Sequence, residues 1–441
     1  MKNINPSKRQ GTKRIGTLAS CEIEKIAAKH EFRIRNSGKI SASILLESFI
    51  LMMQAGVSSY WHWAVSISNL TGTTVSKQAI FNRMGSAWTN TVKALVASIV
   101  SEQGGIYLQE SVFKGFGAVW LQDSSSFHLP DVLYEKFKGN VCKGKQKSVA
   151  KLNLVVNLMT GLCPVMRLDS FTINEQKLSG SILGIARAGD LVIRDLGYFV
   201  LDVFSKLTKA HVFYLSRLKY NVSLFSLSGE MLSLPELLSD KIMLDINVLC
   251  GDKERLPVRL VAIKLDQQQA AERIRKAKND RDRRLNHSSD YYFLLGYIIF
   301  ITNVGQDIWQ AAQVAQAYRC RWNIEILFKS WKSGLRVHKL IPQARTNTNR
   351  VESYLYMMML YLSWFHMLIF TPLRWAVYRD TGRHLSIIKA ALWAINNIRW
   401  FFTGCTQAIA REINYYCLYD KRKDRQNAIE KLISLTNLSL A

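Results

Sequence analysis

The chain has 441 residues, of which 48% are hydrophobic and 21% charged, so a disordered chain is excluded and two or three folded units are expected. Its formal net charge of +26 exceeds what solubility requires and indicates a polyanionic partner, either nucleic acid or an acidic membrane surface. The seven cysteines are scattered without a C-x-x-C pair, which argues against a disulfide framework or a cysteine zinc site and for a reducing compartment.

The first hundred residues carry a helical pattern. Residues 1–18 are basic and polar and lack the apolar stretch of a secretory signal. From residue 21 to about 102, apolar side chains such as Leu45, Phe49 and Met52 recur at the helical period. This part is therefore predicted to be a helical region.

One helix of this region has the form of a DNA-recognition helix. Ser76 is predicted to be its N-cap, and Lys77 and Arg83 would project from the turns that follow. A helix-turn-helix places such side chains on DNA. An ordinary capped surface helix explains the same pattern equally well.

From Ala118 onward the pattern changes from helices to strands. Short apolar runs end in Asp123 and Asp195, and a helix is expected between the third and the fourth strand. The expected elements are strands over 118–123, 149–159, 164–173 and 191–195, and helices over 176–188 and up to about 209. Three strands, a helix, a strand and a helix is the order of a ribonuclease H-like mixed α/β domain.

Strand character continues to residue 304, and helical character follows it. The best strand runs are 212–214, 243–244, 258–263 and 297–302, with a basic helical stretch at 267–285. The apolar segment 354–370 has 17 residues, whereas a membrane span needs about 20. We therefore predict a core helix there and no membrane partner.

A stripe of four polar residues stands out within residues 318–332. On one continuous helix, Tyr318, Arg321, Glu325 and Lys332 fall within an arc of about 60°. The apolar residues occupy a separate stripe that would pack inward: Cys320, Ile324, Leu327, Trp331 and Leu335. A solvated face with ion pairs is the alternative interpretation.

Three carboxylates are candidates for a common site. Asp123 and Asp195 each follow a predicted strand, and the ends of neighbouring strands meet at one edge of a sheet. If Glu325 joined them, the three charges would repel one another unless divalent cations neutralised them. Oxygen ligands suit Mg²⁺ or Mn²⁺, and two such ions can promote phosphodiester cleavage.

The polar stripe resembles the Y-(2)-R-(3)-E-(6)-K signature of DDE transposases of the insertion-sequence-four family, and it matches that signature at all four positions. The segments 121–125, 193–198 and 300–303 resemble the family's motifs around the two Asp residues and before the last helix. The resemblance covers about residues 115–340. Family members often carry a small residue and then Thr after the first Asp, whereas Ser124, Ser125 and Ser126 follow Asp123 here.

The resemblance implies an α/β fold, a ribonuclease H-like catalytic core with a β-rich insertion, flanked by N-terminal and C-terminal helical regions. The expected divisions are a helical DNA-binding region (1–110), the first part of the core (111–210), the insertion (211–304), the last part of the core with the catalytic helix (305–345), and a C-terminal helical region for dimerisation and DNA contacts (346–441).

The same resemblance assigns roles to individual residues. Asp123, Asp195 and Glu325 would be the catalytic ligands of two Mg²⁺ or Mn²⁺ ions per site. Arg321 and Lys332 would hold phosphates beside the cleaved strand, and Tyr318 would contact the DNA backbone near the 5′ end.

Further DNA contacts are expected from the preceding region. The resemblance makes Tyr297, with Tyr291 and Tyr292 behind it, the candidate to stack on a flipped base, with core packing as the commoner fate of an aromatic residue in a strand. The basic stretch, with Arg273, Arg275 and Lys276, would lie along DNA phosphates unless it is an exposed, solvated helix.

Together these patterns predict a cut-and-paste DNA transposase. It would bind the terminal inverted repeats of an insertion sequence, cleave at their boundary and transfer the freed 3′-hydroxyl to target DNA, with a hairpin intermediate implied by resemblance. The expected partners are double-stranded DNA and a second copy of the chain in a synaptic homodimer, in bacterial cytoplasm with the nucleoid. A catalytically idle DNA-binding repressor or architectural derivative is the alternative, and a plain nuclease is also open.

Overall fold

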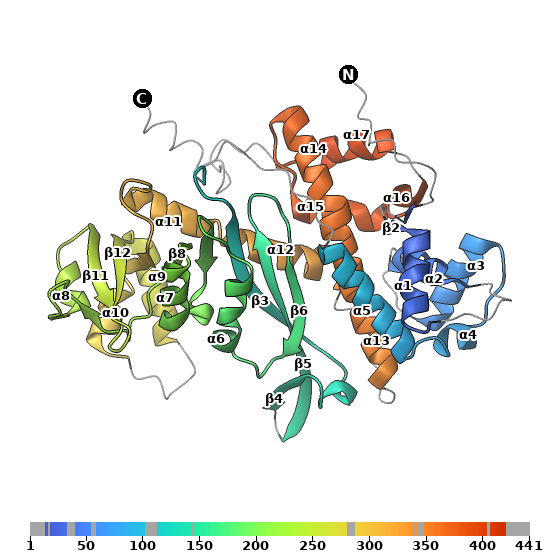
Figure 1. The fold of residues 1–441 in the computed structure, drawn as a ribbon, viewed down its shortest axis with the longest axis horizontal. Helices are drawn as coiled ribbons and strands as arrows, with labels where there is room; N and C mark the ends of the chain where they lie inside the picture. The colour runs from blue at the N-terminus through green and yellow to red at the C-terminus, as the bar shows by residue number, and fades with distance from the viewer. Residues whose placement is uncertain are drawn as a thin grey trace.

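One large sheet forms the middle of the molecule, and helices cover both of its faces (Figure 1). The computed structural model describes residues 14–15, 18–32, 40–53, 59–101, 113–142, 144–279, 287–337, 341, 348–403 and 406–419. The expected loose segment 1–18 lies almost wholly outside these residues, as does the end of the basic stretch, 280–285. The architecture is mixed α/β.

The strands follow the order β10-β9-β11-β12-β13-β8-β7-β3-β5-β4, and β6 also pairs with β5. Neighbours are antiparallel except that β3, β7 and β8 run parallel. Their bounds are β3 (Val119–His128), β4 (Lys138–Cys142), β5 (Lys145–Asn157), β6 (Val165–Ser170), β7 (Leu191–Arg194), β8 (Phe213–Arg217), β9 (Leu224–Phe225), β10 (Met231–Leu232), β11 (Met243–Cys250), β12 (Leu256–Lys264) and β13 (Tyr297–Thr302). A separate two-stranded ribbon pairs β1 (Arg14–Ile15) with β2 (Leu18–Ala19).

The strands of residues 211–304 extend the same sheet. β13 pairs with β8, and β12, β11, β9 and β10 follow outward from it (Figure 1). Short helices lie beside these strands: α8 (Leu234–Leu238), α9 (Gln267–Lys278) and α10 (Ser289–Leu294).

Helices before and after the sheet build the rest of the molecule. The N-terminal group is α1 (Ser20–Lys29), α2 (Ala42–Met53), α3 (Tyr60–Thr71), α4 (Lys77–Phe81) and α5 (Ser86–Ser101). Between strands lie η1 (Asp131–Leu133), α6 (Glu175–Leu178), η2 (Ser179–Gly184), η3 (Leu196–Tyr198) and α7 (Leu201–Lys209). The C-terminal group is α11 (Ala311–Arg319), α12 (Trp322–Lys329), η4 (Ser330–Gly334), α13 (Thr348–Ser363), η6 (Trp364–Phe370), α14 (Thr371–Thr381), α15 (Ile387–Asn396), α16 (Trp400–Thr403) and α17 (Thr406–Tyr416).

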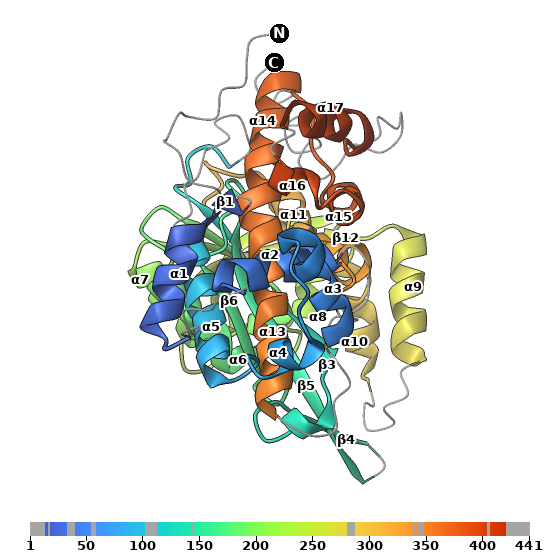
Figure 2. The same cartoon turned by 90° about the vertical axis from the view of Figure 1, so that its right-hand side faces the viewer.

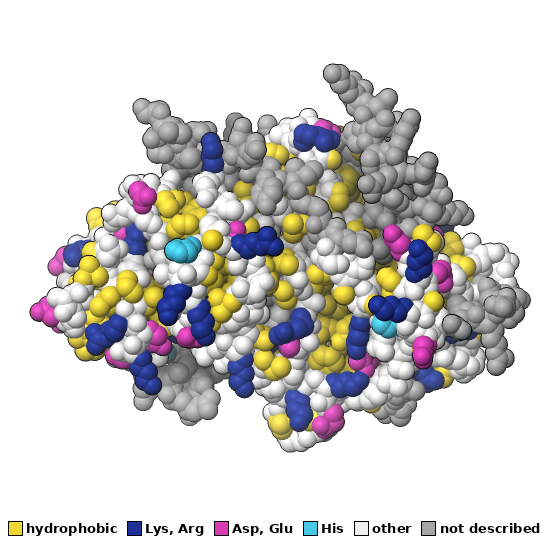
Figure 3. Space-filling model, viewed as in Figure 1, with side chains coloured by type: hydrophobic (Ala, Val, Ile, Leu, Met, Phe, Trp, Pro, Cys, Tyr) yellow, Lys and Arg dark blue, Asp and Glu magenta, His cyan; other side chains and the backbone are white. Residues whose placement is uncertain are grey.

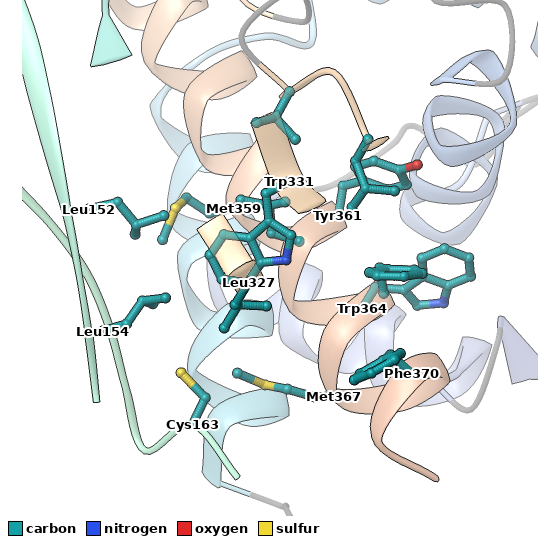
Figure 4. Close-up of a cluster of buried hydrophobic side chains, with 14 of the residues drawn as sticks. Leu152, Leu154, Cys163, Leu327, Trp331, Met359, Tyr361, Trp364, Met367 and Phe370 are labelled. Carbon is teal, nitrogen blue, oxygen red and sulfur yellow. The ribbon is translucent and has the colours of Figure 1, made fainter. Parts of the chain in front are cut away.

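Alternation along the strands divides the apolar side chains between two cores. Leu121, Ile193 and Leu215 face a core shared with α11, α12 and α13. Val192 and Tyr214 face the other core, which α7 and η2 cover. Figure 4 shows the first core, where Leu152 and Leu154 of β5 face the side chains of Leu327, Trp331 and Met359.

Helix α13 joins the N-terminal helices to the sheet (Figures 1 and 2). On one side the Trp88 indole donates to Met357 Sδ at 3.0 Å, and the hydroxyls of Thr89 and Ser353 lie 2.7 Å apart. The helical run Thr348–Thr381 is long and apolar enough to cross a membrane, but 89% of its most apolar window is buried inside the protein. This burial supports the core-helix interpretation of 354–370.

Glu352 of α13 is a nearly buried carboxylate held by two lysines. Lys93 Nζ lies 3.1 Å from Oε1, and Lys136 donates to Oε2. Burial alone would raise the pKa of Glu352, but the hydrogen bonds from Lys136 and Lys93 outweigh it and lower the pKa. The folded carboxyl thus stays ionised at lower pH than the unfolded one, and its stabilisation is lost as the pH falls through the lowered pKa.

We expect Glu352→Gln to reduce the free energy of unfolding by about 1 kcal/mol at neutral pH, since both lysines are partly solvated. The reduction should be smaller at pH 3 than at neutral pH, because the stabilisation is lost as the pH falls through the lowered pKa. Urea unfolding at both pH values measures it. Glu135→Gln, which loses an exposed pair at 3.9 Å, is the control and should change nothing. An equal loss at both pH values would assign the effect to packing.

Candidate active site

The parallel register of β3 and β7 brings two of the acids together. Gln122 pairs with Arg194, so the residues that follow, Asp123 and Asp195, lie side by side. Asp195 follows β7 directly, as expected. Asp123 was expected at the end of its strand but lies within β3, because β3 continues along β5, where Asp123 pairs with Leu154.

Glu325 reaches the same place from α12. Residues 318–332 do not form the single helix that we predicted: α11 ends at Arg319, α12 begins at Trp322, and η4 follows from Ser330. At the break, the amides of Arg321 and Ile324 bond to carbonyls three residues back, as in a tight turn. The predicted apolar stripe is nevertheless buried along its whole length.

The guanidinium of Arg321 meets all three carboxylates. Nη2 lies 2.5 Å from Glu325 Oε1, Nη1 lies 3.4 Å from Asp123 Oδ2, and Nε lies 3.9 Å from Asp195 Oδ1. The Tyr318 hydroxyl donates to Asp195 Oδ1 at 3.3 Å. Five predicted site residues thus form one cluster: Asp123, Asp195, Tyr318, Arg321 and Glu325.

Lys332 lies at the border of this cluster. Its ammonium donates to the Ser126 carbonyl at 3.1 Å, three residues beyond Asp123 on β3. The residue is exposed overall, but partial desolvation of its ammonium lowers the pKa of Lys332. It is a cation beside the acids that bonds to none of them in the described structure.

Burial, more than repulsion by the other acids, perturbs the pKa of Asp123. Burial raises the pKa of Asp123 to about 6, against the opposing effects of the Ser124 amide and Arg321, and the charges of Asp195 and Glu325 raise it further. Burial, followed by the charge of Asp195, also raises the pKa of Tyr318. The Tyr318 hydroxyl therefore stays protonated and acts as a donor.

The cluster has the chemistry of a divalent-cation site. Three carboxylates are hard oxygen donors, and one guanidinium balances only one of their charges. Arg321 Nε is buried without a hydrogen bond, so the guanidinium does not use all of its donors on the acids. Within the described residues no group of three acidic, His or Cys side chains is arranged to hold one metal ion directly, and the guanidinium of Arg321 contacts all three of these carboxylates.

A second acidic contact on β3 was not predicted from the sequence. Glu175 Oε1 accepts hydrogen bonds from the Ser124 hydroxyl at 3.0 Å and from Lys151 Nζ at 2.8 Å. Lys151 is only 5% exposed and lies on β5 among apolar residues. A lysine within an apolar strand pattern was the available signal for this network.

Tyr297 is packed in the core, which is the alternative to the predicted stacking on a flipped base. The side chain is 2% exposed, and its hydroxyl donates to the carbonyls of Leu238 at 2.9 Å and Lys241 at 3.1 Å. Its place in β13 turns it into the core that α8 covers. Tyr291 and Tyr292 are partly exposed, and the Tyr291 ring stacks on His287 at 4.0 Å.

The basic helix α9 extends away from the sheet (Figure 2). None of its twelve residues, all described, is buried. Arg275 and Lys276 are exposed, whereas Arg273 is half-buried and donates to the Tyr297 carbonyl at 3.1 Å. Figure 3 shows that Lys and Arg side chains are spread over the whole visible face of the molecule rather than gathered in one patch.

The candidate recognition helix is short. Ser76 caps α4, and its hydroxyl accepts from the Ala79 amide at 3.1 Å, as predicted. Lys77 is exposed at the start of this five-residue helix. Arg83 folds back and donates to the Ala79 carbonyl at 2.6 Å. A DNA contact by these two cations stays a prediction.

Comparison with known proteins identifies the family of the domain that contains the cluster. Residues 115–362 match the family described as the transposase DDE domain. The chain belongs to this family. It is therefore a transposase, an enzyme that acts on DNA.

Relatives of this transposase match along most of its length. It is 25% identical over 359 residues to the transposase for insertion sequence element IS231F of Bacillus thuringiensis subsp. israelensis, covering 76% of this chain and 74% of that one. It is 25% identical over 345 residues, 72% of each chain, to the transposase for IS1151 of Clostridium perfringens. A solved piggyBac transposase synaptic complex with hairpin DNA aligns at 10% identity and a TM-score of 0.41, over 93% of this chain and 84% of that one.

The raised pKa of Asp123 makes a stability prediction for the metal-free transposase. Because the folded pKa of about 6 exceeds the ordinary 3.8, ionised Asp123 destabilises the fold above pH 6, and this cost fades as the pH falls toward 4. Asp123→Asn should therefore stabilise the metal-free protein by about 1–3 kcal/mol at pH 8 and change little at pH 4. Urea unfolding in EDTA measures both.

Asp245→Asn provides a control of opposite sign. Its side chain is as exposed as that of Asp123, 18% in each case, but the Arg259 hydrogen bond lowers its pKa. This variant should be destabilised at pH 8. A destabilised Asp123→Asn at that pH would contradict the raised pKa of Asp123, whose main cause is burial.

Proposed function

We propose that this transposase cleaves DNA at the ends of an insertion sequence and joins them to a target, with Asp123, Asp195 and Glu325 as its catalytic acids. The observation that carries the proposal is their convergence on Arg321 from β3, β7 and α12. Asp123 and Glu325 lie 202 positions apart in the chain. Bringing three like charges together over such a separation does not stabilise the fold, so a functional reason is the better explanation. The match to the Y-(2)-R-(3)-E-(6)-K signature supports assignment to the insertion-sequence-four type.

The strand arrangement supports a ribonuclease H-like core. The order β6-β5-β3-β7-β8, with the first three strands antiparallel and β3, β7 and β8 parallel, is what that core requires. In this proposal β9 to β13 constitute the β-rich insertion. The flanking helical regions would serve DNA binding and dimerisation.

We propose Asp123, Asp195 and Glu325 as ligands of two Mg²⁺ or Mn²⁺ ions. Bound there, the ions would activate the attacking oxygen and stabilise the leaving oxygen of a phosphodiester. In the absence of these ions, Arg321 balances one of the three negative charges. Its guanidinium would become free to hold a phosphate when cations take its place. The exposed ammonium of Lys332 would hold a second phosphate, and Tyr318 would orient Asp195 and the nearby backbone.

The partners proposed are transposon-end and target DNA, and a second copy of the chain in the synaptic complex. The net charge of +26 supports a polyanionic partner. We place the protein in the bacterial cytoplasm with the nucleoid, and we include a hairpin end as an intermediate because of the family signature.

Alanine at each acid tests the catalytic assignment. Asp123→Ala, Asp195→Ala and Glu325→Ala should each lower single-turnover cleavage of an end-containing duplex by at least about 10³-fold, since each removes metal-ligand oxygens. DNA binding should stay close to wild type, because the acids offer phosphates no attraction. Near wild-type cleavage by any one variant would remove that acid from the site. An inactive wild-type protein that still binds the ends would favour the idle derivative.

Helix α9 makes a separate prediction about DNA binding. Its exposed cations Arg275, Lys276 and Lys278 would contact phosphates. Each lost contact should reduce the slope of log K against log salt by about 0.9, so the triple alanine variant should lose up to about 2.7. Fluorescence anisotropy over a salt series measures this slope. Lys206→Ala, which removes an exposed cation on α7, is a charge control. Equal slopes for wild type and the triple variant would place α9 away from DNA.

A further inference from the structure

Arg194 is a fully buried cation without a carboxylate partner among the described residues. Its guanidinium donates to the Ser179 hydroxyl at 2.7 Å, to Gln122 Oε1 at 2.7 Å and to the Ser179 carbonyl. All three acceptors are neutral. A buried charge usually stabilises a fold less than an apolar side chain of similar size would, so core packing alone does not explain this arginine.

The place of Arg194 in the sheet relates it to the acids. Arg194 immediately precedes Asp195 on β7, Gln122 immediately precedes Asp123 on β3, and the two are register partners. Because successive side chains of a strand point to opposite faces, this pair lies on the face of the sheet opposite the acids. The bond between Arg194 Nη2 and Gln122 Oε1 thus joins the two strands one residue before each acid.

Gln122 and Ser179 also bond to the helical turns η2 and η3. Gln122 Nε2 donates to the Leu178 carbonyl at 3.2 Å and to the Ser181 hydroxyl at 3.0 Å. The Ser179 hydroxyl, which accepts from Arg194, donates to the Tyr198 carbonyl at 2.8 Å. These hydrogen bonds connect η2 and η3 to β3 and β7 on the face of the sheet opposite the acids.

We propose that Arg194, Gln122 and Ser179 form a positioning bridge that sets the spacing between the carboxylates of Asp123 and Asp195. The inference rests on the proposed catalytic role of those acids. Arg194 bonds to neither acid and acts through the strands, so it is a positioning residue. Arg321, on the acids' own face, supplies the charge that holds them together, whereas Arg194 supplies the spacing at which they can share bound cations.

Two substitutions at Gln122 test the bridge while leaving Arg194 in place. Gln122→Leu removes the acceptor, whereas Gln122→Glu keeps an oxygen at the same position and pairs with the guanidinium. Arg194→Met is the third variant. Val248→Ala, which truncates a buried side chain on β11, four strands away from β7, is the control for destabilisation alone. Each is assayed at a temperature where circular dichroism shows it fully folded.

Three readouts separate positioning from mere stability. For Gln122→Leu and Arg194→Met we expect Mn²⁺ affinity, measured by electron paramagnetic resonance without DNA, or the saturated single-turnover rate, to fall by about 10- to 100-fold. DNA affinity should be unchanged. Gln122→Glu should retain more of both than Gln122→Leu, and Val248→Ala should lower the melting temperature without altering affinity or rate.

Lowered melting temperatures with wild-type Mn²⁺ affinity and rate in Gln122→Leu would overturn the proposal and leave the bridge a packing feature. If Arg194→Met does not fold, the two Gln122 variants still decide the matter. Asp195→Ala keeps the two claims apart. If that variant cleaves DNA normally, the proposed active site has failed, whereas its inactivity beside a normal Gln122→Leu refutes only the bridge.

Discussion

The contact of one guanidinium with three carboxylates is the interaction that organises this transposase. Asp123, Asp195 and Glu325 come from two strands and a helix, and in a protein with a net charge of +26 they are gathered around Arg321. Three like charges held this close repel one another, and burial, more than this repulsion, raises the pKa of Asp123. The surrounding fold has to overcome the repulsion among the three charges, which bound divalent cations would relieve under the proposed function.

The fold overcomes it by fixing each acid through the backbone. The parallel register of β3 and β7 holds two acids side by side, and the buried stripe of α12 holds the third above them. Helix α13 packs beneath this arrangement and connects it to the N-terminal helices through Trp88 and Met357. The N-terminal helices are thereby linked to the strands that carry the acids through one continuous core.

The sequence predicted the elements whose signal is local and missed the contacts that are long-range. Strand β13 has the predicted bounds, and the apolar stripe from Cys320 to Leu335 is buried as predicted, because both follow from periodicity. Periodicity does not show which face of β13 meets a second layer, so it left base stacking and core packing both open for Tyr297. The Glu175–Ser124 contact and the Arg194–Gln122 bond each join residues distant in the chain, so no local pattern predicts them.

The most direct test of the metal-dependent active site is a sulfur substitution at the scissile phosphate. If ions held by Asp123, Asp195 and Glu325 contact that phosphate, a phosphorothioate diastereomer placed there should cleave slowly in Mg²⁺ and recover in Mn²⁺, which accepts sulfur more readily. Single-turnover cleavage of pre-bound end DNA measures both rates. Equal cleavage of the oxygen and both sulfur substrates in Mg²⁺, or cleavage that persists in EDTA, would contradict this account.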